Sequence, residues 1–391
     1  GTDVTILYPV NESLMLRKAR DARIVRMAAS LAARGHQVVL LVGKSGASRK
    51  EIVAYYGIED LPNLEIVQLP ILRKNARWKL SWNGVFYLFA LIELIKRSRR
   101  GPVDVVYLSV PKLAAFILSW KRWIRAERFV YELHELGIYP ENERPTKGEK
   151  KVDRLEKRIL PRMDAVIVTT EAIRRALKRR FPRTPVETVP LGTTADGAKL
   201  PPYFFGPKAL YNVCYIGQLY PAQGVDLLVR ACARIEQVRL HVIGGQSEEI
   251  ARLRSLAEES GGGEKTFFHG FVLPHQVHRL IPQMDIFALP SRDTIRMNYV
   301  AHIKIYEYLS YGRPIVATRL RSTEEELRDG VNAVLVKPDD PAALAEGIRK
   351  LIARPDVARR IAAKGLEAAP SYYWEARAKR IERFILGLPR S

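Results

Sequence analysis

The sequence predicts an α/β protein in which two doubly wound, Rossmann-like domains follow one another along the chain. Two observations predict this fold class. Short apolar segments alternate with segments of helical periodicity, a pattern typical of parallel sheets covered by helices. The chain of 391 residues is also too long for one compact core and suits two domains of about 200 residues each.

Each half of the chain contributes six predicted strands. A predicted helix over 17–34, which ends at Gly35, separates the first two strands. Because ligands of open α/β sheets bind beyond the carboxyl ends of the strands, we expect a site in a cleft between the two sheets. The strands of the first half are Val4–Tyr8, His36–Val42, Leu64–Leu69, Val103–Leu108, Arg128–Leu133 and Ala165–Thr169. Those of the second half are Val213–Ile216, Arg239–Ile243, Thr266–His269, Ile286–Leu289, Pro314–Thr318 and Ala333–Val336.

A proline-rich stretch, Pro190–Gly206, separates the two series of strands. We therefore predict a first domain over 1–190, a linker over 191–207 and a second domain over 208–370. A strongly basic, amphipathic helix is expected at about Trp374–Leu386, within a final segment over 371–391.

Composition and charge narrow the choice of partner. The formal net charge is +22, and residues 1–190 hold 36 Lys and Arg against 20 Asp and Glu. This half should attract an anionic partner such as anionic lipid, a phosphorylated acceptor or nucleic acid. No apolar run is long enough to span a bilayer and no signal peptide is visible, so a cytoplasmic protein is expected. Cys214 and Cys232 suit buried, reduced thiols, and no Cys/His set has the spacing of metal ligands.

The segment Lys304–Thr318 carries the clearest functional signal. Its pattern predicts an amphipathic helix with one carboxylate, Glu307, followed by a break at Gly312 and an apolar strand. A carboxylate at the mouth of an α/β sheet can accept hydrogen bonds from the two hydroxyls of a ribose. The alternative is an exposed helical glutamate with no ligand.

Glycines at strand ends predict a phosphate site. Gly217 follows a strand and precedes a helix that begins near Gly224, and Gly244 and Gly245 end the next strand in the same way. Small residues let backbone N–H groups approach a phosphate, and a helix N-terminus favours negative charge. Ordinary strand-to-helix turns are the alternative, because glycine is the default turn residue.

Eight phrases follow one another along both halves of the chain. They are Leu31–Val38, Val130–Leu136, Val168–Glu171, Tyr215–Tyr220, Val242–Gly245, His269–Phe271, Ala288–Ser291 and Glu326–Gly330. Taken in this order, they resemble the GT-B glycosyltransferases of the retaining family 4 type. The resemblance covers nearly the whole chain and implies two Rossmann-like domains facing across a cleft, with the C-terminal helix crossing back to the first. It also implies transfer of a sugar from a UDP- or GDP-linked donor to a hydroxyl acceptor, with retained configuration and without a metal or other cofactor.

The resemblance further implies the roles of individual residues. The first domain should bind the acceptor and the second the nucleotide sugar. His134, Lys304 and Glu307 are expected to be catalytic, with His134 donating to the sugar or its leaving group, Lys304 at the diphosphate and Glu307 on the ribose. A loop histidine that packs structurally is the alternative for His134. The expected donor-binding residues are Gly217, Gln218, Gln223, Gly244, Gly245, Gly270, Phe271, Val272, Ser291, Arg292, Tyr308 and Leu309.

Three positions depart from the family pattern. Relatives usually carry basic residues where Gln218 and Gln223 stand, and often a glutamate where Tyr299 stands. Glutamine supplies no charge, and hydrogen bonds from charged groups are roughly twice as strong as neutral ones. Either another cation neutralises the diphosphate, or the donor is unusual, or the activity is weak. The nearest candidate cations in the sequence are Lys304, Arg292 and Arg296.

An apolar stripe in the first half of the sequence has two interpretations, one of which is contact with a membrane surface. The ordinary interpretation is a core helix with solvated ends. The alternative is contact with an anionic membrane surface on its cytoplasmic face, or with a lipid-linked acceptor, because basic clusters flank the stripe. The stripe is Trp82, Phe86, Phe89, Ile92 and Ile95; the clusters are Arg73, Lys74, Arg77 and Lys79 before it and Lys96, Arg97, Arg99 and Arg100 after it.

Two other function classes stay open. A basic phosphate-binding protein would explain the charge, but no nucleic-acid motif is present, which disfavours nucleic acid as the partner. A degenerate relative without transferase activity would explain Gln218, Gln223 and Tyr299. Binding of a nucleoside diphosphate would separate these classes.

Overall fold

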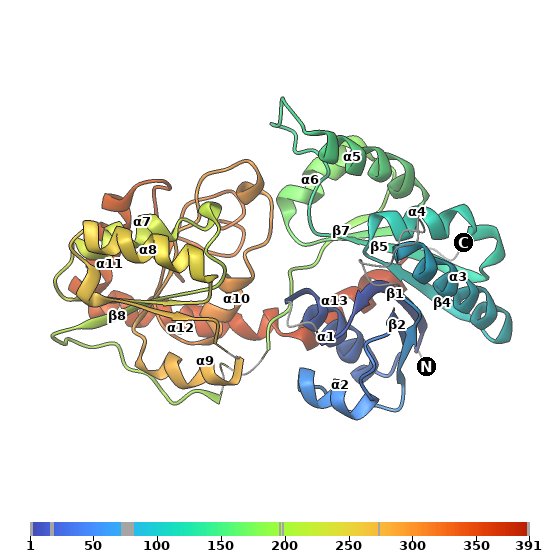
Figure 1. Cartoon of the computed structure of the whole chain (residues 1–391), viewed down its shortest axis with the longest axis horizontal. Coiled ribbons are helices and arrows are strands. Elements are labelled where there is room, and N and C mark those ends of the chain that lie inside the picture. The colour runs from blue at the N-terminus through green and yellow to red at the C-terminus, as the bar shows by residue number, and fades with distance from the viewer. Residues whose placement is uncertain are drawn as a thin grey trace. The chain divides into compact units, whose positions relative to one another are not determined.

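A computed structural model describes residues 3–15, 19–71, 82–194, 197, 199–272 and 274–388. Contacts divide the chain into two compact units, Gly1–Gly192 with Trp374–Ser391, and Thr193–Tyr373. Each unit contains one parallel sheet with helices packed on it (Figure 1). The predicted pair of Rossmann-like α/β domains is therefore confirmed.

The first unit is built on a seven-stranded parallel sheet with the order β3-β2-β1-β4-β5-β6-β7. The strand order reverses between β1 and β4, and sheets of this kind bind ligands at such a switch point. The strands are β1 (Thr5–Ser13), β2 (Gln37–Gly43), β3 (Leu64–Leu69), β4 (Val103–Leu108), β5 (Ala126–Leu133), β6 (Ala165–Val168) and β7 (Val186–Thr188). The helices are α1 (Ala19–Ala33), α2 (Arg49–Tyr56), α3 (Trp82–Arg100), α4 (Pro111–Ser119), α5 (Lys147–Ile159), α6 (Glu171–Arg180) and α13 (Trp374–Leu386).

The second unit repeats this design with six parallel strands in the order β10-β9-β8-β11-β12-β13. Its switch point lies between β8 and β11. The strands are β8 (Tyr211–Ile216), β9 (Val238–Ile243), β10 (Thr266–Gly270), β11 (Ile286–Leu289), β12 (Ile315–Thr318) and β13 (Val334–Val336). The helices are α7 (Val225–Ala233), α8 (Ser247–Glu259), α9 (Pro274–Leu280), α10 (Ile303–Ser310), α11 (Pro341–Ala353) and α12 (Pro355–Ala368).

All twelve predicted strands are present, with ends that differ by a few residues at most except for β1, which is longer. Only β7 was not predicted. This edge strand has three residues, Val186–Thr188, of which only the first is buried. Such a segment is too short and too polar to give an alternating pattern.

Residues that follow Gly192 pack on the second unit. Phe205 is buried in its core and stacks on Tyr211, with ring centroids 5.4 Å apart. The carbonyl of Phe205 accepts a hydrogen bond from Arg359 at 2.8 Å, and the hydroxyl of Tyr203 bonds to Asp285. Much of the stretch predicted as a linker is therefore part of the second unit's surface and core.

Helix α3 buries a different face from the one predicted. Phe86, Ala90 and Leu94, at helical spacing, are fully buried, whereas Phe89 and Ile92 are 40% and 48% exposed. The helix is apolar on more than one side, so its periodicity does not single out the core face. The side chain of Trp82 and the basic cluster over 73–79 lie outside the described residues.

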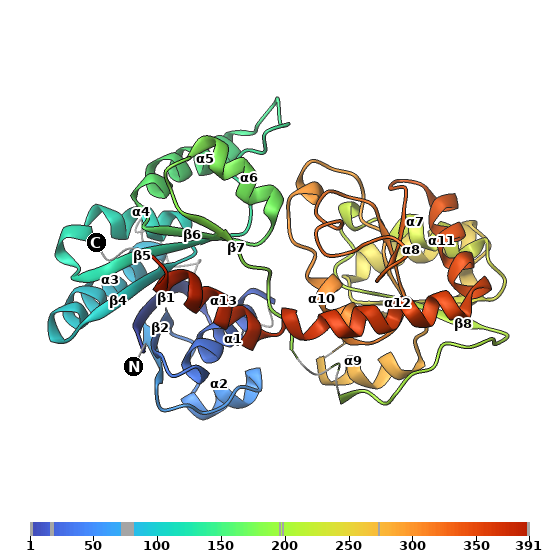
Figure 2. The ribbon, with the colours of Figure 1, turned by 180° about the vertical axis from the view of Figure 1, so that it is seen from behind.

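Helix α13 belongs to the first unit and packs against α1, as both views show (Figures 1 and 2). Its buried stripe runs through Ile381 and Ile385, and the same stripe includes a charged residue, Arg377. Among the described residues, no helix is both long enough and apolar enough to cross a membrane.

Candidate functional site

Three glycine turns form the carboxyl edge of the second sheet beside its switch point. Gly217, Gly244 and Gly270 follow or end β8, β9 and β10, and all three have positive φ, at 146°, 110° and 66°. Gly217 N donates to the carbonyl of Ile243 at 2.8 Å, and Gly244 N donates to the carbonyl of Gly270 at 2.7 Å. A Cβ on Gly244 would collide with the carbonyl of Gly217, so the turns touch through bare backbone.

Helix α10 places Lys304 directly against Gly217. A Cβ on Gly217 would lie 2.7 Å from the Lys304 ammonium and closer still to Cε. The ammonium is 3.4 Å from Oε1 of Gln223 and 5.4 Å from the centre of the Tyr215 ring. Lys304 therefore meets the turn at Gly217 and the side chain of Gln223, which precedes it by 81 positions.

The charge of Lys304 is poorly compensated. In the part of the chain that the structure describes, its ammonium forms no ion pair with a carboxylate, and its partners are the amide oxygen of Gln223 and the ring of Tyr215. Burial lowers the pKa of Lys304, and the field of Glu307 opposes that shift. A cation kept in such surroundings is stabilised by an anionic ligand, and a phosphate is the anion that glycine turns accommodate.

Glu307 is half-buried on α10, one turn after Lys304. Its backbone carbonyl accepts a hydrogen bond from Ser310 at 2.6 Å, which helps to end the helix. Lys304 and Glu307 are thus carried by one helix, and the ammonium of Lys304 lies beside the glycine turns.

Gln223 and Gln218 differ in their surroundings. Oε1 of Gln223 accepts from Lys304 and also lies 3.3 Å from the hydroxyl of Tyr215, so the NH₂ group of Gln223 keeps its donors for a ligand. Gln218 has an exposed side chain, and its carbonyl accepts from Tyr215 at 2.6 Å. Tyr215 therefore holds both glutamine positions in place.

Gly224 joins the turn after β8 to the turn after β11. Its φ is 69°, and a Cβ there would collide with the carbonyl of Pro290. Arg292 N donates to the carbonyl of Ala222 at 2.9 Å, which ties the same two turns together. The N-terminus of α7 is fixed at the switch point by these contacts.

The other candidate cations are engaged or lie at the surface. The Arg292 guanidinium bonds to Asp226 at 2.5 Å and lies 3.5 Å from Asp339, so two carboxylates already match its charge. Arg296 is exposed on a short 3₁₀ turn. Lys304 is therefore the stronger candidate to neutralise a bound anion.

The remaining residues that were predicted to bind the donor fall into two groups, one accessible to solvent and one buried. Phe271 is exposed and Val272 half-buried after the Gly270 turn, and Gly245 packs its bare Cα against Leu219. Three others are buried and support the fold: Tyr308, whose hydroxyl accepts from Ile216 N at 3.0 Å, with Leu309 and Ser291. Oγ of Ser291 has no hydrogen-bond partner among the described residues.

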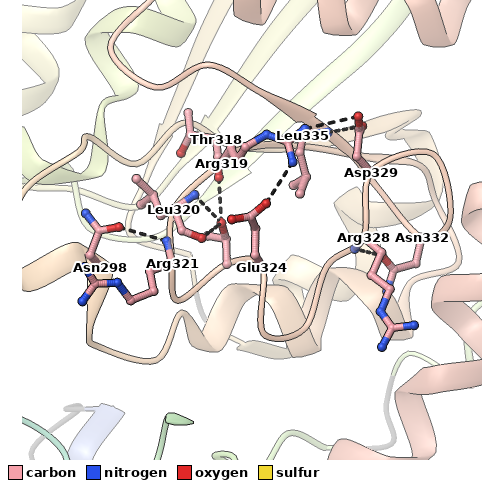
Figure 3. Close-up of polar contacts among 11 residues, drawn as sticks. Asn298, Thr318, Arg319, Leu320, Arg321, Glu324, Arg328, Asp329, Asn332 and Leu335 are labelled. Carbon is pink, nitrogen blue, oxygen red and sulfur yellow. Dashed lines mark hydrogen bonds and ion pairs between the residues drawn. The ribbon is translucent and has the colours of Figure 1, made fainter. Parts of the chain in front are cut away.

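The loop after β12 is held by matched charges and capped backbone groups (Figure 3). Arg319 bonds to Glu324 at 2.9 Å and to Asp329 at 3.3 Å. The backbone N–H of Arg321 donates to Asn298 at 2.9 Å, which links this loop to the segment before α10.

Tyr299 is buried, and the Arg321 guanidinium lies 5.1 Å above its ring. A cation–π contact therefore occupies the position where relatives were expected to carry an acidic side chain. Contacts to a transferred sugar through a carboxylate at this position are excluded.

The carboxyl edge of the first sheet carries a network of polar side chains. Nε2 of His134 lies 3.0 Å from Oε1 of Glu132, at the end of β5. Glu132 also bonds to Tyr107 on β4 and to Arg377 on α13. The ring of Tyr107 packs edge-on against Tyr8 of β1, with centroids 4.9 Å apart, so the network reaches the switch point between β1 and β4.

Burial and charge set the protonation of this network. Burial acts to raise the pKa of Glu132, but Arg377 and His134 oppose it and hold that pKa well below its usual range. Burial also lowers the pKa of His134, and the attraction of Glu132 only partly offsets this. Burial raises the pKa of Tyr8 to about 12, with help from Glu132. Near neutral pH the network therefore contains a carboxylate, a neutral imidazole and neutral phenols.

Two family models match the chain on either side of its unit boundary. The description "Glycosyl transferase 4-like domain" applies to residues 21–192, and "Glycosyl transferases group 1" applies to residues 211–354. Together they span most of both units. The chain belongs to the GT-B glycosyltransferases of the family 4 type.

Relatives of this GT-B glycosyltransferase are distant. The D-inositol 3-phosphate glycosyltransferase of Xylanimonas cellulosilytica is 23% identical over 389 residues, covering 91% of this chain and 88% of the relative. The phosphatidyl-myo-inositol mannosyltransferase of Mycobacterium leprae is 28% identical over 201 residues, covering 50% of this chain and 52% of the relative. The chain thus covers less than two thirds of several relatives, for example 44% of the D-inositol 3-phosphate glycosyltransferase of Corynebacterium urealyticum.

Solved structures match the whole fold. Sucrose-phosphate synthase from Thermosynechococcus elongatus superposes with a TM-score of 0.72 at 18% identity, covering 97% of this chain and 98% of that one. Anabaena HepE in complex with UDP and glucose gives 0.72 at 17% identity, covering 98% and 99%. TarM gives 0.75 at 13% identity, covering 98% of each chain.

Sequence reasoning missed several residues of this glycosyltransferase. Arg377, Tyr107 and Arg23 were not predicted to belong to a site. Arg377 left a usable signal, because it stands on the same helical stripe as Ile381 and Ile385. A charged residue on the apolar stripe of an amphipathic helix indicates a buried ion pair. Tyr107 and Arg23 gave no comparable signal.

Proposed function

We propose that this protein transfers a sugar from a UDP- or GDP-linked donor to a hydroxyl acceptor with retention of configuration. One observation carries the proposal: the ammonium of Lys304, which has no carboxylate partner among the residues that the structure describes, lies against the bare turn at Gly217. In this proposal the diphosphate occupies that point. Glu307, one helical turn further, accepts hydrogen bonds from the ribose.

The proposed chemistry is electrostatic. The bond between the sugar and the diphosphate breaks through an oxocarbenium-like state, and negative charge grows on the leaving phosphate. Backbone N–H groups of the glycine turns and the ammonium of Lys304 stabilise that charge without having to reorganise. Lys304 thereby takes over the role of the basic residues that are absent at Gln218 and Gln223, and we propose that no metal is needed.

The acceptor is proposed to carry a hydroxyl and a phosphate, either free or lipid-linked. The excess of 16 positive charges over residues 1–190 supports an anionic acceptor at the first unit. Arg23 of α1 supports it too, because it has no ion-pair partner in the described part of the chain, and burial lowers its pKa. The names of two relatives, which include inositol 3-phosphate and phosphatidyl-myo-inositol, agree with this class.

Calorimetry with UDP and GDP, followed by a hydrolysis screen of nucleotide sugars, tests the donor site because neither needs an acceptor. The intact protein should bind one of the two nucleotides and slowly hydrolyse a matching sugar. Lys304→Met should weaken nucleotide binding by about ten- to a hundredfold, the value of one charged hydrogen bond. The exposed Lys350 of α11 offers a matched control, and Lys350→Met should bind normally. If the intact protein binds neither nucleotide, the degenerate-relative interpretation is favoured instead.

A membrane role for the first unit is supported by an exposed apolar group on α3. Leu88, Phe89 and Ile92 are 51%, 40% and 48% exposed, and the basic residues Lys96 and Arg99 follow on the same helix. We propose that this face binds an anionic membrane peripherally, which would place the enzyme at the cytoplasmic side of a membrane.

Sedimentation with vesicles that contain anionic lipid tests this second proposal. The double variant Phe89→Ser, Ile92→Ser should lose vesicle binding, because both side chains lie at the surface and their removal spares the core. Val331→Ser, which changes an equally exposed apolar residue of the second unit, should bind like the unmodified protein. Equal binding by all three proteins would exclude α3 as the contact.

A further inference from the structure

Glu132 is the meeting point of side chains from three distant parts of the first unit. It accepts hydrogen bonds from Tyr107 and Arg377, and its Oε1 lies 3.0 Å from Nε2 of His134. The carboxylate and the guanidinium are 4% and 2% exposed. Charges buried to this degree depend on one another, because neither is stabilised by bulk water.

Arg377 is fixed by more than its ion pair. Its Nη1 donates to the carbonyls of Val189 at 2.8 Å and Pro190 at 2.7 Å, while Nη2 donates to Glu132. The guanidinium therefore connects α13 to the end of β5 and to the segment after β7. Helix α13 supplies the counter-charge for the carboxylate that contacts His134.

These contacts decide which nitrogen of His134 carries the proton. The carboxylate of Glu132 can only accept, so Nε2 of His134 must be the donor in their hydrogen bond. In a neutral ring, Nδ1 then holds a lone pair and can only accept. Nδ1 is buried and has no hydrogen-bond partner among the described residues. An unsatisfied buried acceptor costs free energy, and a ligand that donates a hydrogen bond to this nitrogen would remove that cost.

We propose that Glu132 and Arg377 are positioning residues, which together present His134 as a neutral imidazole whose Nδ1 accepts a hydrogen bond from a substrate hydroxyl. The inference rests on the proposed transferase function, since the hydroxyl belongs to the sugar or to the acceptor. It also changes the role expected of His134. The only N–H of the neutral ring is engaged with Glu132, so His134 accepts from a hydroxyl and does not donate to a phosphate.

The charges around His134 explain why a carboxylate can orient the ring without protonating it. An isolated carboxylate next to a histidine favours the imidazolium form. Here burial favours the neutral ring, and Arg377 offsets the charge of Glu132, so the ring is held in place and stays neutral. The charged groups that act on His134 are Glu132 from β5, Arg23 from α1 and Arg377 from α13. Tyr107 from β4 and Tyr8 from β1 act on Glu132, and Arg20 from α1 acts on Arg23.

Nuclear magnetic resonance titration of the His134 ring tests the positioning role directly and needs no substrate. The signal is assigned by its loss in His134→Asn. In Arg377→Met the pKa of His134 should rise by at least about one unit, since Glu132 loses its counter-charge; one unit is a tenfold change in the ratio of neutral to charged ring. Arg380→Met, on the exposed side of the same helix, should leave the titration unchanged. Equal titrations in both variants would overturn the proposal.

A second variant decides the matter if Arg377→Met does not fold. Glu132→Gln removes the carboxylate that bonds to His134, so the pKa of His134 should fall below its value in the unmodified protein. A titration that does not move in Glu132→Gln would overturn the proposal just as clearly.

The pH dependence of donor hydrolysis tests the role of Nδ1. If a neutral His134 is required, the acid limb of the rate should follow the titration of the ring and move to higher pH in Arg377→Met but not in Arg380→Met. If the pKa of His134 changes in Arg377→Met but the acid limb of the hydrolysis rate does not, the proposed contact between Nδ1 and a hydroxyl is overturned. Absence of hydrolysis at every pH would count against the proposed function, and the titration would still report on the positioning pair.

Discussion

The switch points of the two sheets occupy equivalent places in the same strand order, yet they are built from different groups. In the second unit the edge consists of bare backbone at Gly217 and Gly244, together with the ammonium of Lys304, which no carboxylate of the described residues pairs. In the first unit it consists of side chains that bond to one another around Glu132, and Nδ1 of His134 has no hydrogen-bond partner among the described residues. One scaffold can therefore offer either a binding site for a phosphate or a rigid hydrogen-bond acceptor, depending on whether glycine or polar side chains end the strands.

The largest expected effect is on the stability of the first unit. Glu132→Ala leaves Arg377 buried without a counter-charge and removes the partner of Tyr107, so the free energy of unfolding should fall by about 3–5 kcal/mol. Urea unfolding followed by circular dichroism measures the loss. Glu187→Ala, which changes an exposed carboxylate on β7, should cost little. Similar stabilities for the two variants would mean that the side-chain network is not what holds this edge together.

The next largest effect is expected at the glycine edge. Gly217→Ala forces a Cβ into the side chain of Lys304 at a φ of 146°, so nucleotide binding should be lost, and strain of about 1–3 kcal/mol should lower the stability. Gly261→Ala provides the control, because Gly261 also has positive φ, at 75°, but nothing lies within 4 Å of its Cβ position. Calorimetry with UDP or GDP and thermal unfolding distinguish the two. Normal nucleotide binding by Gly217→Ala would show that the phosphate does not use this turn.

A third effect depends on pH and concerns His302, which lies before α10. Burial lowers the pKa of His302 to about 4, and Nε2 lies 2.9 Å from Oγ of Ser322. Between pH 6.5 and 4 the unfolded chain binds a proton that the native ring does not, so stability should fall by about 1.4 kcal/mol per pH unit as the solution is acidified. His302→Gln should flatten this dependence in urea unfolding between pH 7 and 4.5. An unchanged slope would show that other groups dominate the acid response.

The smallest expected effect sharpens the assignment of Lys304. Gln223→Lys places a second ammonium beside the first, about where relatives carry their lysine, and should change nucleotide affinity by less than about threefold, because the site already has one cation. In a Lys304→Met background the same substitution should restore most of the lost affinity. Double-mutant calorimetry measures the coupling. Additive effects would show that the two positions serve different parts of the ligand.

Much of the fold and part of the site could be predicted from the sequence. Strands that are buried on both faces, such as β6 and β11, leave continuous apolar runs whose limits are easy to recognise. Lys304 could be proposed as a cation because it stands one turn before Glu307. Their sharing of α10 is confirmed, whereas their roles toward a ligand stay predictions.

The rest could not be predicted, because it depends on contacts between distant residues or on a choice between similar faces. Glu132 and Arg377 are separated by 245 positions, and no local pattern connects them. Arg292 was a candidate cation for the diphosphate, but in the fold its guanidinium is bonded to Asp226, which lies 66 positions earlier in the sequence. On α3, Phe89 and Ala90 both fit a helical period, and only packing decides that the smaller residue faces the core.

Because α13 follows the entire second unit in the sequence, the two units cannot finish folding in the order in which they begin to emerge from the ribosome. Residues 193–373 are continuous and can close as soon as they are synthesised, whereas the earlier sheet still lacks its last helix. Until that helix arrives, an anionic group stays unneutralised inside the amino-terminal lobe. Translation of α13 is therefore the event that completes the lobe that was started first.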